Sequence, residues 1–272
     1  MYADCSVLMS IYHNTLKDHF VECIKSINDQ SVKPKELILV QDGIIPFDVN
    51  EILFSLLNCS TKVIVNEINM GLPYSLNLGL NYCTYDIVFR MDADDICEKN
   101  RFAIQYNEML NNENLIVLGS NVFLINSDSF ILNKKRHVPL FDSMIRKILL
   151  FKNPFNHPSV VFRKKYVNQV GGYSNLYLYE DWYLWFKMSK LKNCFFRNID
   201  EPLLGYRIRS FDERKGLRII KAEFKFYKQL YLDNYINLIT FIFLFIIKSL
   251  VRILPSSSYL FFKHKFDTFR NI

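Results

Sequence analysis

Residues 82–95 have the sequence YCTYDIVFRMDADD, and this stretch gives the clearest indication of the fold. The apolar run at residues 87–89 predicts a buried strand, and Asp92, Asp94 and Asp95 follow shortly after its end. Carboxylates this close together repel one another and raise each other's pKa unless a cation neutralises them. A divalent ion that also binds phosphate oxygens resolves the repulsion. The alternative is a solvated turn before a helix, with Asp95 as a cap, because acidic residues are favoured there.

Upstream of this stretch, apolar strands alternate with helical segments. The strands are predicted at residues 5–11, 36–40, 62–65 and 86–91, and the helices at residues 16–29, 51–58 and 72–81. Continuous apolar strands that alternate with helices predict an α/β fold, in which a parallel sheet carries helices on both faces.

Polar residues follow each of these strands. They are Tyr12, Asp42, the turn that contains Asn69 and Gly71, and the acidic cluster at Asp92 and Asp94. In parallel sheets ligands bind beyond the carboxyl ends of the strands, so the topology gathers these groups along one rim. Each turn by itself is an ordinary one, but together they suit a nucleotide diphosphate. The aromatic ring would stack on a base, Asp42 would accept a hydrogen bond from it, and the acidic cluster would hold ribose and a metal.

Composition and charge exclude a disordered chain and a basic nucleic-acid-binding domain. Half of the 272 residues are hydrophobic, which suffices for one large core with a small appendage. The net charge of +7 arises in the C-terminal quarter, where residues 206–272 hold 13 basic and 5 acidic side chains. That local excess predicts an anionic partner such as a membrane surface or phosphates, and no nucleic acid. The six cysteines form no C-x-x-C pair, which predicts buried free thiols in a reducing cytoplasm.

The second half of the chain contains strands at residues 116–119, 160–162 and 200–207, a hairpin at residues 126–129, and three further polar motifs. His157 stands between two prolines, as a structural or a substrate-facing histidine. Gly172, before Tyr173, indicates a loop that approaches a ligand without Cβ crowding. Glu180 and Asp181 precede an aromatic helix that begins at Trp182, where a carboxylate either caps the helix or accepts a proton at the edge of an aromatic pocket.

Residues 211–272 are predicted to form a helical tail. At residues 217–232 an apolar stripe runs beside a basic one, which predicts either an amphipathic helix on an anionic membrane or a helix packed on the domain with a solvated basic face. Residues 235–254 are very apolar, but Lys248 and Arg252 interrupt them, which favours an in-plane or re-entrant helix over a membrane span.

The ordered set of motifs resembles the inverting, family-two glycosyltransferases of the GT-A fold, in particular the bacterial enzymes of O-antigen and surface-polysaccharide synthesis. Singly the motifs are weak, and together they cover residues 4–207; the matching stretches are residues 6–12, 39–43, 69–72, 90–95, 153–158, 171–173 and 180–185. The resemblance implies a Rossmann-like mixed sheet flanked by helices. It also implies a catalytic domain at residues 1–210, with a nucleotide-binding half at 1–115 and an acceptor-binding half at 116–210.

The family's roles carry over by position. The resemblance implies that Tyr12 and Asp42 hold uracil, that Asp92 lies near the ribose, that Asp94 binds Mn²⁺ or Mg²⁺, and that Asp181 is the general base. The other residues predicted to bind the UDP-sugar are Asn69, Gly71 and Arg90, and those predicted for the sugar or acceptor pocket are His157, Gly172, Tyr173, Glu180 and Trp182. Where many members carry a histidine ligand this chain has Arg207 and Arg209, which suit a diphosphate instead. Gln41 also departs from the usual Asp-Asp-Gly, which leaves the base contacts less defined.

The expected activity is transfer of a hexose from UDP-glucose or UDP-galactose to a lipid-diphosphate-linked GlcNAc, with β linkage. The tail at residues 211–265 would bind the cytoplasmic face of the bacterial inner membrane. Two other functions stay open from the residues alone. A sugar-phosphate nucleotidyltransferase would use a similar sheet and metal, but no Gly-rich basic loop follows the first strand. A catalytically inactive membrane-associated assembly protein would leave the acidic cluster unexplained.

Overall fold

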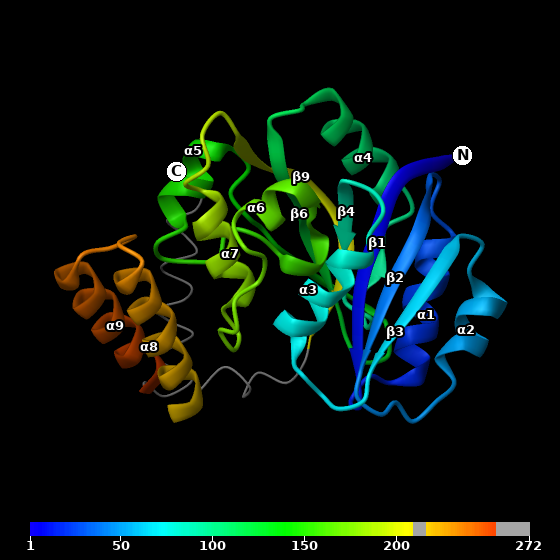
Figure 1. Ribbon diagram of the computed structural model, residues 1–272, viewed down its shortest axis with the longest axis horizontal. Coiled ribbons are helices and arrows are strands. Elements are labelled where there is room, and N and C mark those ends of the chain that lie inside the picture. Colours follow the sequence, from blue (N-terminus) through cyan, green and yellow to red (C-terminus); the bar gives the residue numbers. More distant parts are fainter. Residues whose placement is uncertain (209–215, 254–272) are drawn as a thin grey trace. The chain divides into compact units, whose positions relative to one another are not determined.

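The computed structural model describes residues 1–208 and 216–253 (Figure 1). The chain divides into two compact units. The first comprises residues 1–175 and 184–208, and the second comprises residues 176–183 together with the described part of the tail, residues 216–253. Arg209, one of the two arginines predicted to bind a diphosphate, lies outside the described residues, as do residues 254–265 of the predicted membrane-binding segment.

The first unit is built on a mixed sheet (Figure 1). Its strand order is β3-β2-β1-β4-β8-β6-β9-β5, with β7 paired to β6. Strands β3, β2, β1 and β4 run parallel, β8 is antiparallel to both of its neighbours, and β6 and β9 run parallel. The strands are β1 (Tyr2–Tyr12), β2 (Lys33–Asp42), β3 (Ser60–Asn66), β4 (Ile87–Arg90), β5 (Ile96–Cys97), β6 (Leu115–Ile125), β7 (Ile131–Arg136), β8 (Val161–Arg163) and β9 (Phe195–Arg207).

Helices cover both faces of this sheet because successive strand residues point to opposite sides. Val7 and Met9 of β1 belong to the core formed with α1, α2 and α4. Leu8, between them, meets α3 at Gly79, where a Cβ would overlap with the leucine side chain. Across both units, the described helices are α1 (Lys17–Asn28), α2 (Val49–Leu56), α3 (Leu72–Tyr82), α4 (Arg101–Asn111), α5 (Asp142–Ile148), the 3₁₀ turn η1 (His157–Ser159), α6 (Lys164–Gln169), α7 (Glu180–Met188), and, in the second unit, α8 (Leu217–Leu232) and α9 (Leu238–Ile253).

The predicted mixed α/β sheet flanked by helices is confirmed, with differences in its second half. The last strand was expected at residues 200–207, but β9 begins at Phe195 because it pairs with β6 along its length. Strand β5 was missed, since two residues show no periodicity; it is held by pairing to β9. The fourth strand ends at Arg90, one residue before its predicted end.

In the second unit, α8 and α9 lie side by side as a helical hairpin (Figure 1). Phe224 of α8 packs against Phe241 and Phe245 of α9, with ring centroids 5.8 and 5.2 Å away. A partly buried ion pair joins the same helices, with Arg252 Nη2 2.8 Å from Glu223 Oε1. Helix α8 confirms the amphipathic helix predicted at residues 217–232. Within the described ranges, no helix combines the length and apolarity that a membrane span requires.

Candidate active site

The loop after β4 brings three carboxylates together. One side-chain oxygen each from Asp92, Asp94 and Asp95 lies within 4.8 Å of the others. Burial, followed by the charges of Asp92 and Asp94, raises the pKa of Asp95 well above its ordinary value. The backbone N–H of Arg207 offsets part of this by donating a 2.8 Å hydrogen bond to Asp95 Oδ1. Asp95 does not cap the next helix, because β5 follows it and Asn100 precedes α4.

Arg90 connects this loop to the end of β4. Its Nη2 lies 2.5 Å from Asp92 Oδ1, and the side chain is only 2% exposed. Burial opposes the charged form of Arg90, but the charge and hydrogen bond of Asp92 outweigh it and raise its pKa above the ordinary value. Its Nε and Nη1 have no hydrogen-bond partner among the described residues. Because buried N–H groups are rarely left unpaired, these two nitrogens keep unused capacity to donate to an ordered water or a ligand.

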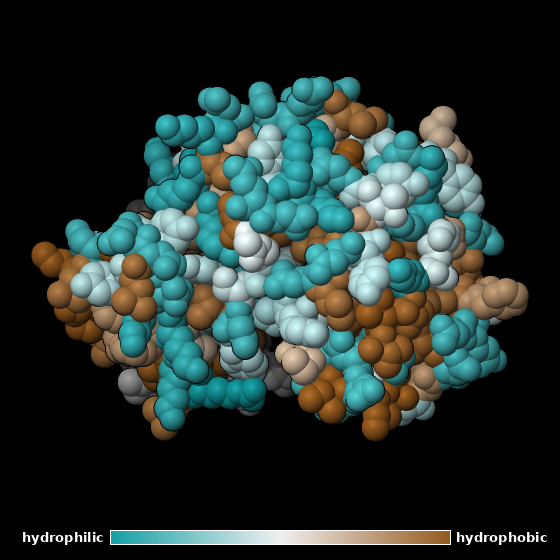
Figure 2. All heavy atoms as spheres, viewed as in Figure 1, coloured by the Kyte–Doolittle hydropathy of each residue, from teal (hydrophilic) through white to brown (hydrophobic). Residues whose placement is uncertain are grey.

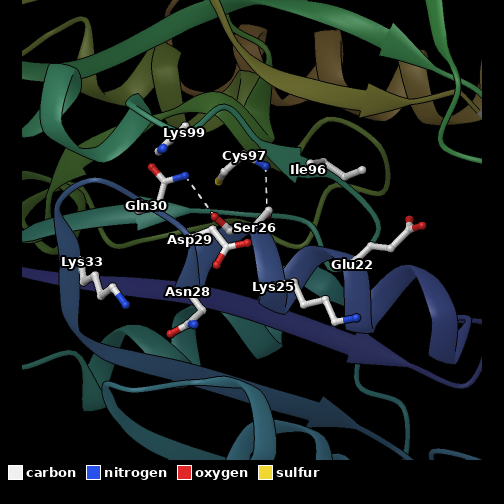
Figure 3. Close-up of a pocket in the computed structure, with 10 residues that line it drawn as sticks. All are labelled: Glu22, Lys25, Ser26, Asn28, Asp29, Gln30, Lys33, Ile96, Cys97 and Lys99. Atoms are coloured by element: carbon white, nitrogen blue, oxygen red, sulfur yellow. Dashed lines mark hydrogen bonds between the residues drawn. The ribbon is translucent and has the colours of Figure 1, made fainter.

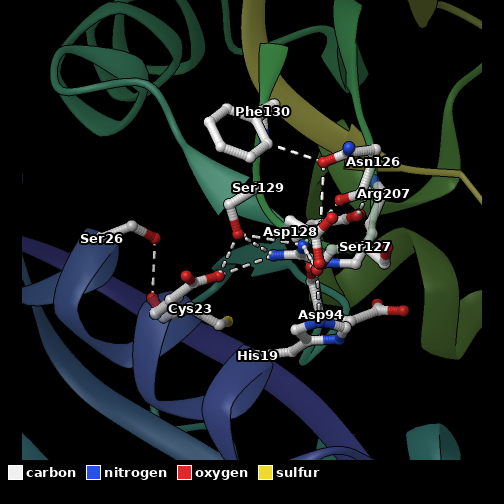
Figure 4. A network of polar contacts seen from close by, with 12 residues as sticks. His19, Cys23, Ser26, Asp94, Asn126, Ser127, Asp128, Ser129, Phe130 and Arg207 are labelled. Carbon is white, nitrogen blue, oxygen red and sulfur yellow. Dashed lines mark hydrogen bonds and ion pairs between the residues drawn. The ribbon is translucent and has the colours of Figure 1, made fainter. Parts of the chain in front are cut away.

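Arg207, at the end of β9, contacts the backbone of the acidic loop and of the β6–β7 hairpin (Figure 4). Its Nε donates to the Asp94 carbonyl at 2.7 Å, and its Nη1 to the carbonyls of Asn126 and Ser127 at 2.8 and 2.9 Å. Its Nη2 forms an ion pair with Glu22 at 2.8 Å. All three guanidinium nitrogens are therefore engaged by protein groups. These contacts fix the backbone of the loop, and they do not support the predicted role of Arg207 as a diphosphate ligand.

Helix α1 and the β6–β7 hairpin complete this support (Figure 4). Ser129 of the hairpin donates a 2.5 Å hydrogen bond to Glu22 of α1, and His19 also reaches the hairpin. Cys23 of α1 donates a weak hydrogen bond to the Asp92 carbonyl at 3.4 Å. These residues were missed from the sequence because polar residues on a helix usually indicate a solvated face.

The rim at the ends of β1 and β2 gathers residues as predicted. Tyr12 and Asp42 are register partners on the two strands. Asp42 is buried; its Oδ1 accepts a hydrogen bond from Met70 N at 2.8 Å and its Oδ2 one from Gly71 N at 2.9 Å. The Asn69 side chain reaches the Asp42 carbonyl at 3.4 Å. Asp42 thus holds the loop that enters α3, a role not predicted, and its contact with a base stays a prediction.

A second polar group surrounds Tyr173. The Asn77 amide exchanges two hydrogen bonds with the backbone of Tyr173, at 2.7 and 2.8 Å. The Tyr173 hydroxyl lies 3.1 Å from His157 Nε2. Burial, and then the charge of Arg90, lowers the pKa of His157 well below its ordinary value, so the ring is neutral near pH 7. The arrangement offers a substrate the polar atoms of an uncharged histidine beside a tyrosine hydroxyl.

Gly172 owes its identity to packing. Its φ of +67° lies in the left-handed region, and a Cβ would overlap with Asn77 Oδ1. Its carbonyl accepts a 2.5 Å hydrogen bond from Lys187 Nζ, and burial lowers the pKa of that lysine to about 8. Asn77 therefore fills the space that a Cβ would occupy at Gly172, and the predicted contact of Gly172 with a ligand stays a prediction.

Helix α7 begins with the predicted acidic pair. Glu180 and Asp181 lie in its first turn, and both are buried. Asp181 Oδ1 accepts a hydrogen bond from the N–H of Trp182 at 2.7 Å. This turn belongs to the second unit, with the tail helices. The roles of Asp181 as base and of Glu180 and Trp182 in a sugar pocket stay predictions.

Comparison with known proteins assigns the family. The family described as "Glycosyl transferase family 2" matches residues 6–171. This chain belongs to glycosyl transferase family 2. The glycosyltransferase is 37% identical over 258 residues to an Escherichia coli UDP-Gal:alpha-D-GlcNAc-diphosphoundecaprenol beta-1,3-galactosyltransferase. The alignment covers 93% of this chain and 92% of the relative. It is 32% identical over 253 residues to the amylovoran biosynthesis glycosyltransferase AmsE of Erwinia amylovora, across 92% of this chain and 94% of the relative.

Solved structures agree on the fold. Residues 1–349 of S. aureus TarS, in complex with UDP-GlcNAc, superpose with a TM-score of 0.62 at 17% identity, over 84% of this chain and 67% of that one. A longer TarS structure matches with a TM-score of 0.60, and the glycosyltransferase spans 40% of its length. Family membership favours transfer of a sugar over the nucleotidyltransferase alternative.

The acidic loop of the glycosyltransferase fits a divalent cation. Its donor set consists of carboxylate oxygens, which Mg²⁺ and Mn²⁺ prefer. Asp95 Oδ2 is buried and has no hydrogen-bond partner within the described part of the chain. A cation beside this cluster would oppose both the burial and the like charges that raise the pKa of Asp95.

A separate cavity of about 710 Å³ lies between α1 and β5 (Figure 3). Lys25, Asp29 and Lys99 contribute charges of both signs to its lining. At its wall the N–H of Cys97 donates to Ser26 Oγ at 3.0 Å. None of the residues predicted to bind substrate lines this cavity, and its mixed charge favours no single sign of ligand.

Proposed function

We propose that the glycosyltransferase transfers a hexose from UDP-galactose or UDP-glucose to a lipid-diphosphate-linked GlcNAc and inverts the anomeric configuration, giving a β linkage. The observation that carries the proposal is the acidic loop with Arg90, in the same sheet whose rim bears Tyr12 and Asp42. This arrangement suits a base, a ribose and a metal-bound diphosphate. The name of the 37% identical relative supports the choice of donor and acceptor.

The donor site is assigned residue by residue. The Tyr12 ring stacks on uracil and Asp42 accepts a hydrogen bond from it. Asp92 lies near the ribose, and Asp92 and Asp94 hold Mn²⁺ or Mg²⁺. The two unpaired guanidinium nitrogens of Arg90, Nε and Nη1, donate to diphosphate or sugar oxygens. When bound, the ion supplies positive charge that stabilises the leaving diphosphate, an effect of several kcal/mol.

Asp181 is the proposed general base. Its carboxylate takes the proton of an acceptor hydroxyl while that oxygen forms a bond to the anomeric carbon, from the face opposite the nucleotide. The bond from the anomeric carbon to the phosphate oxygen breaks, and its electron pair leaves with UDP. We assign contact with the accepting or transferred sugar to His157, Tyr173, Glu180 and Trp182. Placement of a general base is worth about 10²–10⁴-fold in rate.

The test is a screen of nucleotide sugars against a synthetic GlcNAc-diphosphate-lipid acceptor, with product linkage read by NMR. Asp181→Asn should reduce transfer by about 10²–10⁴-fold while metal-dependent UDP binding persists. Glu113→Gln, at an exposed position, is the matched acid-to-amide control and should keep wild-type transfer. Normal turnover by Asp181→Asn would refute the assignment of the base. UDP binding without transfer of any sugar by the wild type would favour the inactive assembly protein.

The hairpin of α8 and α9 supports the proposed membrane contact. Along α9, five apolar side chains recur at helical spacing and are 47–79% exposed: Ile239, Ile242, Phe243, Ile246 and Leu250. On α8, Lys221, Lys225 and Lys228 are exposed. Figure 2 shows hydrophobic residues along α9 beside hydrophilic residues along α8. An apolar stripe flanked by lysines suits shallow insertion into an anionic membrane surface.

We therefore propose that the enzyme binds peripherally to the cytoplasmic face of the bacterial inner membrane, where a lipid-linked acceptor is found. Flotation with anionic vesicles tests this, with zwitterionic vesicles as the control. Phe243→Ser should weaken binding to anionic vesicles, because it removes an exposed apolar group from the stripe. Ile44→Ser, an exposed apolar position in the first unit, is the matched control. Equal flotation of both variants with the wild type would contradict the assignment of this face.

A further inference from the structure

The segment that carries Asp181 forms one compact unit with the tail helices. Residues Leu176–Tyr183 group with α8 and α9. We infer that the hairpin positions the catalytic base as well as contacting lipid, and that Phe226 of α8 is the main positioning residue for Asp181. This inference rests on the proposed function, in which Asp181 is the base.

Phe226 packs on the residues before and after the pair Glu180 and Asp181, and we call this contact the clamp. Its side chain is fully buried. Its ring stacks on Tyr179 with centroids 5.0 Å apart and an interplanar angle of 25°, and lies 4.6 Å from the ring of Trp182. Tyr179 immediately precedes Glu180, and Trp182 immediately follows Asp181. A single ring therefore packs on the residues that flank the pair Glu180 and Asp181.

Other contacts along this segment also come from the hairpin. The Arg218 guanidinium lies 4.5 Å from the centre of the Tyr177 ring. The rings of Tyr183 and Tyr235 are 6.3 Å apart. Helix α7 has nine residues, and helices this short are marginal without tertiary packing. The start of α7, and with it the direction of the Asp181 side chain, consequently depends on packing against α8.

This buried clamp is separate from the lipid-facing stripe. The stripe consists of exposed residues on α9, whereas Phe226 is buried and its ring packs on Tyr179, Trp182 and Tyr227. A tail that served only as an anchor would need the stripe alone. The hairpin therefore predicts two effects that mutations can separate: membrane binding through α9 and placement of the base through α8.

The test measures kcat, the KM for the UDP-sugar and the Kd for UDP in the full chain, with a short-lipid acceptor that needs no membrane. Phe226→Ala should lower kcat by roughly 10- to 100-fold, because a misplacement of about 1 Å costs on the order of 10²-fold. The KM for the UDP-sugar and the metal-dependent Kd for UDP should stay within about twofold, since these depend on the first unit. Phe226→Leu, which keeps an apolar side chain, should recover part of the lost kcat.

Phe224→Ala is the matched control. It removes the same side chain two residues earlier on α8, where Phe224 is 40% exposed and packs on α9 instead. A kcat near that of the wild type is expected for this variant. Equal losses of kcat in the Phe224 and Phe226 variants, or an unchanged kcat in Phe226→Ala, would overturn the inference.

If Phe226→Ala fails to fold, Phe226→Leu decides: a reduced kcat with unchanged UDP binding supports the clamp, and a wild-type kcat overturns it. The Asp181→Asn variant separates this inference from the proposed function. Loss of transfer in Asp181→Asn with normal kcat in both Phe226 variants would leave the function standing and remove only the clamp. Normal kcat in Asp181→Asn would remove the base itself.

Discussion

Replacing Arg207 by Met should destabilise the first unit and weaken metal binding at the acidic loop. Methionine has a similar length but no N–H donors. The carbonyls of Asp94, Asn126 and Ser127 would each lose a hydrogen bond of 2.7 to 2.9 Å from a guanidinium that is 3% exposed. The backbone N–H of residue 207 would still donate to Asp95, so that contact survives the substitution.

The magnitude follows from these contacts. A buried polar group left without its partner costs about 1–3 kcal/mol. The three carbonyls share one site and relax together, so we expect about 3–5 kcal/mol in total, less than three independent losses would give. Glu22 adds little because its side chain is 41% exposed and regains water. The loss is large against the 5–15 kcal/mol of a typical domain.

Urea unfolding followed by circular dichroism, in metal-free buffer, measures the change in the free energy of unfolding. Titration of UDP binding with Mn²⁺ measures the second effect, for which about 10- to 100-fold weaker metal affinity is expected, as for other groups that orient ligands. Arg197→Met is the matched control on the same strand. Arg197 is 43% exposed and forms one ion pair, with Glu108 at 2.8 Å, so its loss should cost about 1 kcal/mol or less. Equal destabilisation by the two substitutions would refute the role given to Arg207.

Three further predictions concern strain, pH and the metal. Gly172→Ala should destabilise by about 1–3 kcal/mol more than Gly171→Ala, because both have positive φ but only Gly172 has Asn77 in the way; thermal unfolding of the two variants measures the difference. Burial lowers the pKa of His157 below 6.5 in the folded state, so the unfolded chain takes up that proton first; stability should be fully present above pH 6.5 and fall as the pH drops below it. Urea unfolding from pH 7.5 to 5 should show a flatter dependence for His157→Gln, and an unchanged slope would contradict the assignment. EDTA should abolish transfer and weaken UDP binding, and Mn²⁺ or Mg²⁺ should restore both; full transfer in metal-free buffer would argue against a metal at the acidic loop.

The first half of the fold was predictable because its signals are local. Apolar runs mark β1, β2 and β4, and turn residues mark the loops that follow them. Parallel topology then dictates that the strand ends share a rim, which is why Tyr12 and Asp42 could be placed together before the register was known. The acidic loop was also evident, since three carboxylates after a buried strand demand a chemical explanation.

The second half was less predictable because pairing over long distances shapes it. Strand β9 runs beside β6 with several register shifts, and neither apolar alternation nor length indicated its start at Phe195. Gly172 is a similar case. The sequence indicated a backbone free of Cβ crowding there, and only the position of Asn77 on α3 shows what a Cβ would meet.

The residues that carry the proposed chemistry and those that hold them in place differ in how visible they are. Asp94 and Asp181 stand in short motifs whose charge density draws attention in any reading of the chain. Arg207 stood out only as a diphosphate candidate and Phe226 looks like an ordinary core aromatic, so the sequence showed neither residue's role in holding its segment. The two classes should therefore fail differently. Loss of a motif carboxylate removes a chemical group, whereas loss of a holding residue keeps that group and changes its geometry. Metal affinity and stability should fall for Arg207, and kcat should fall for Phe226.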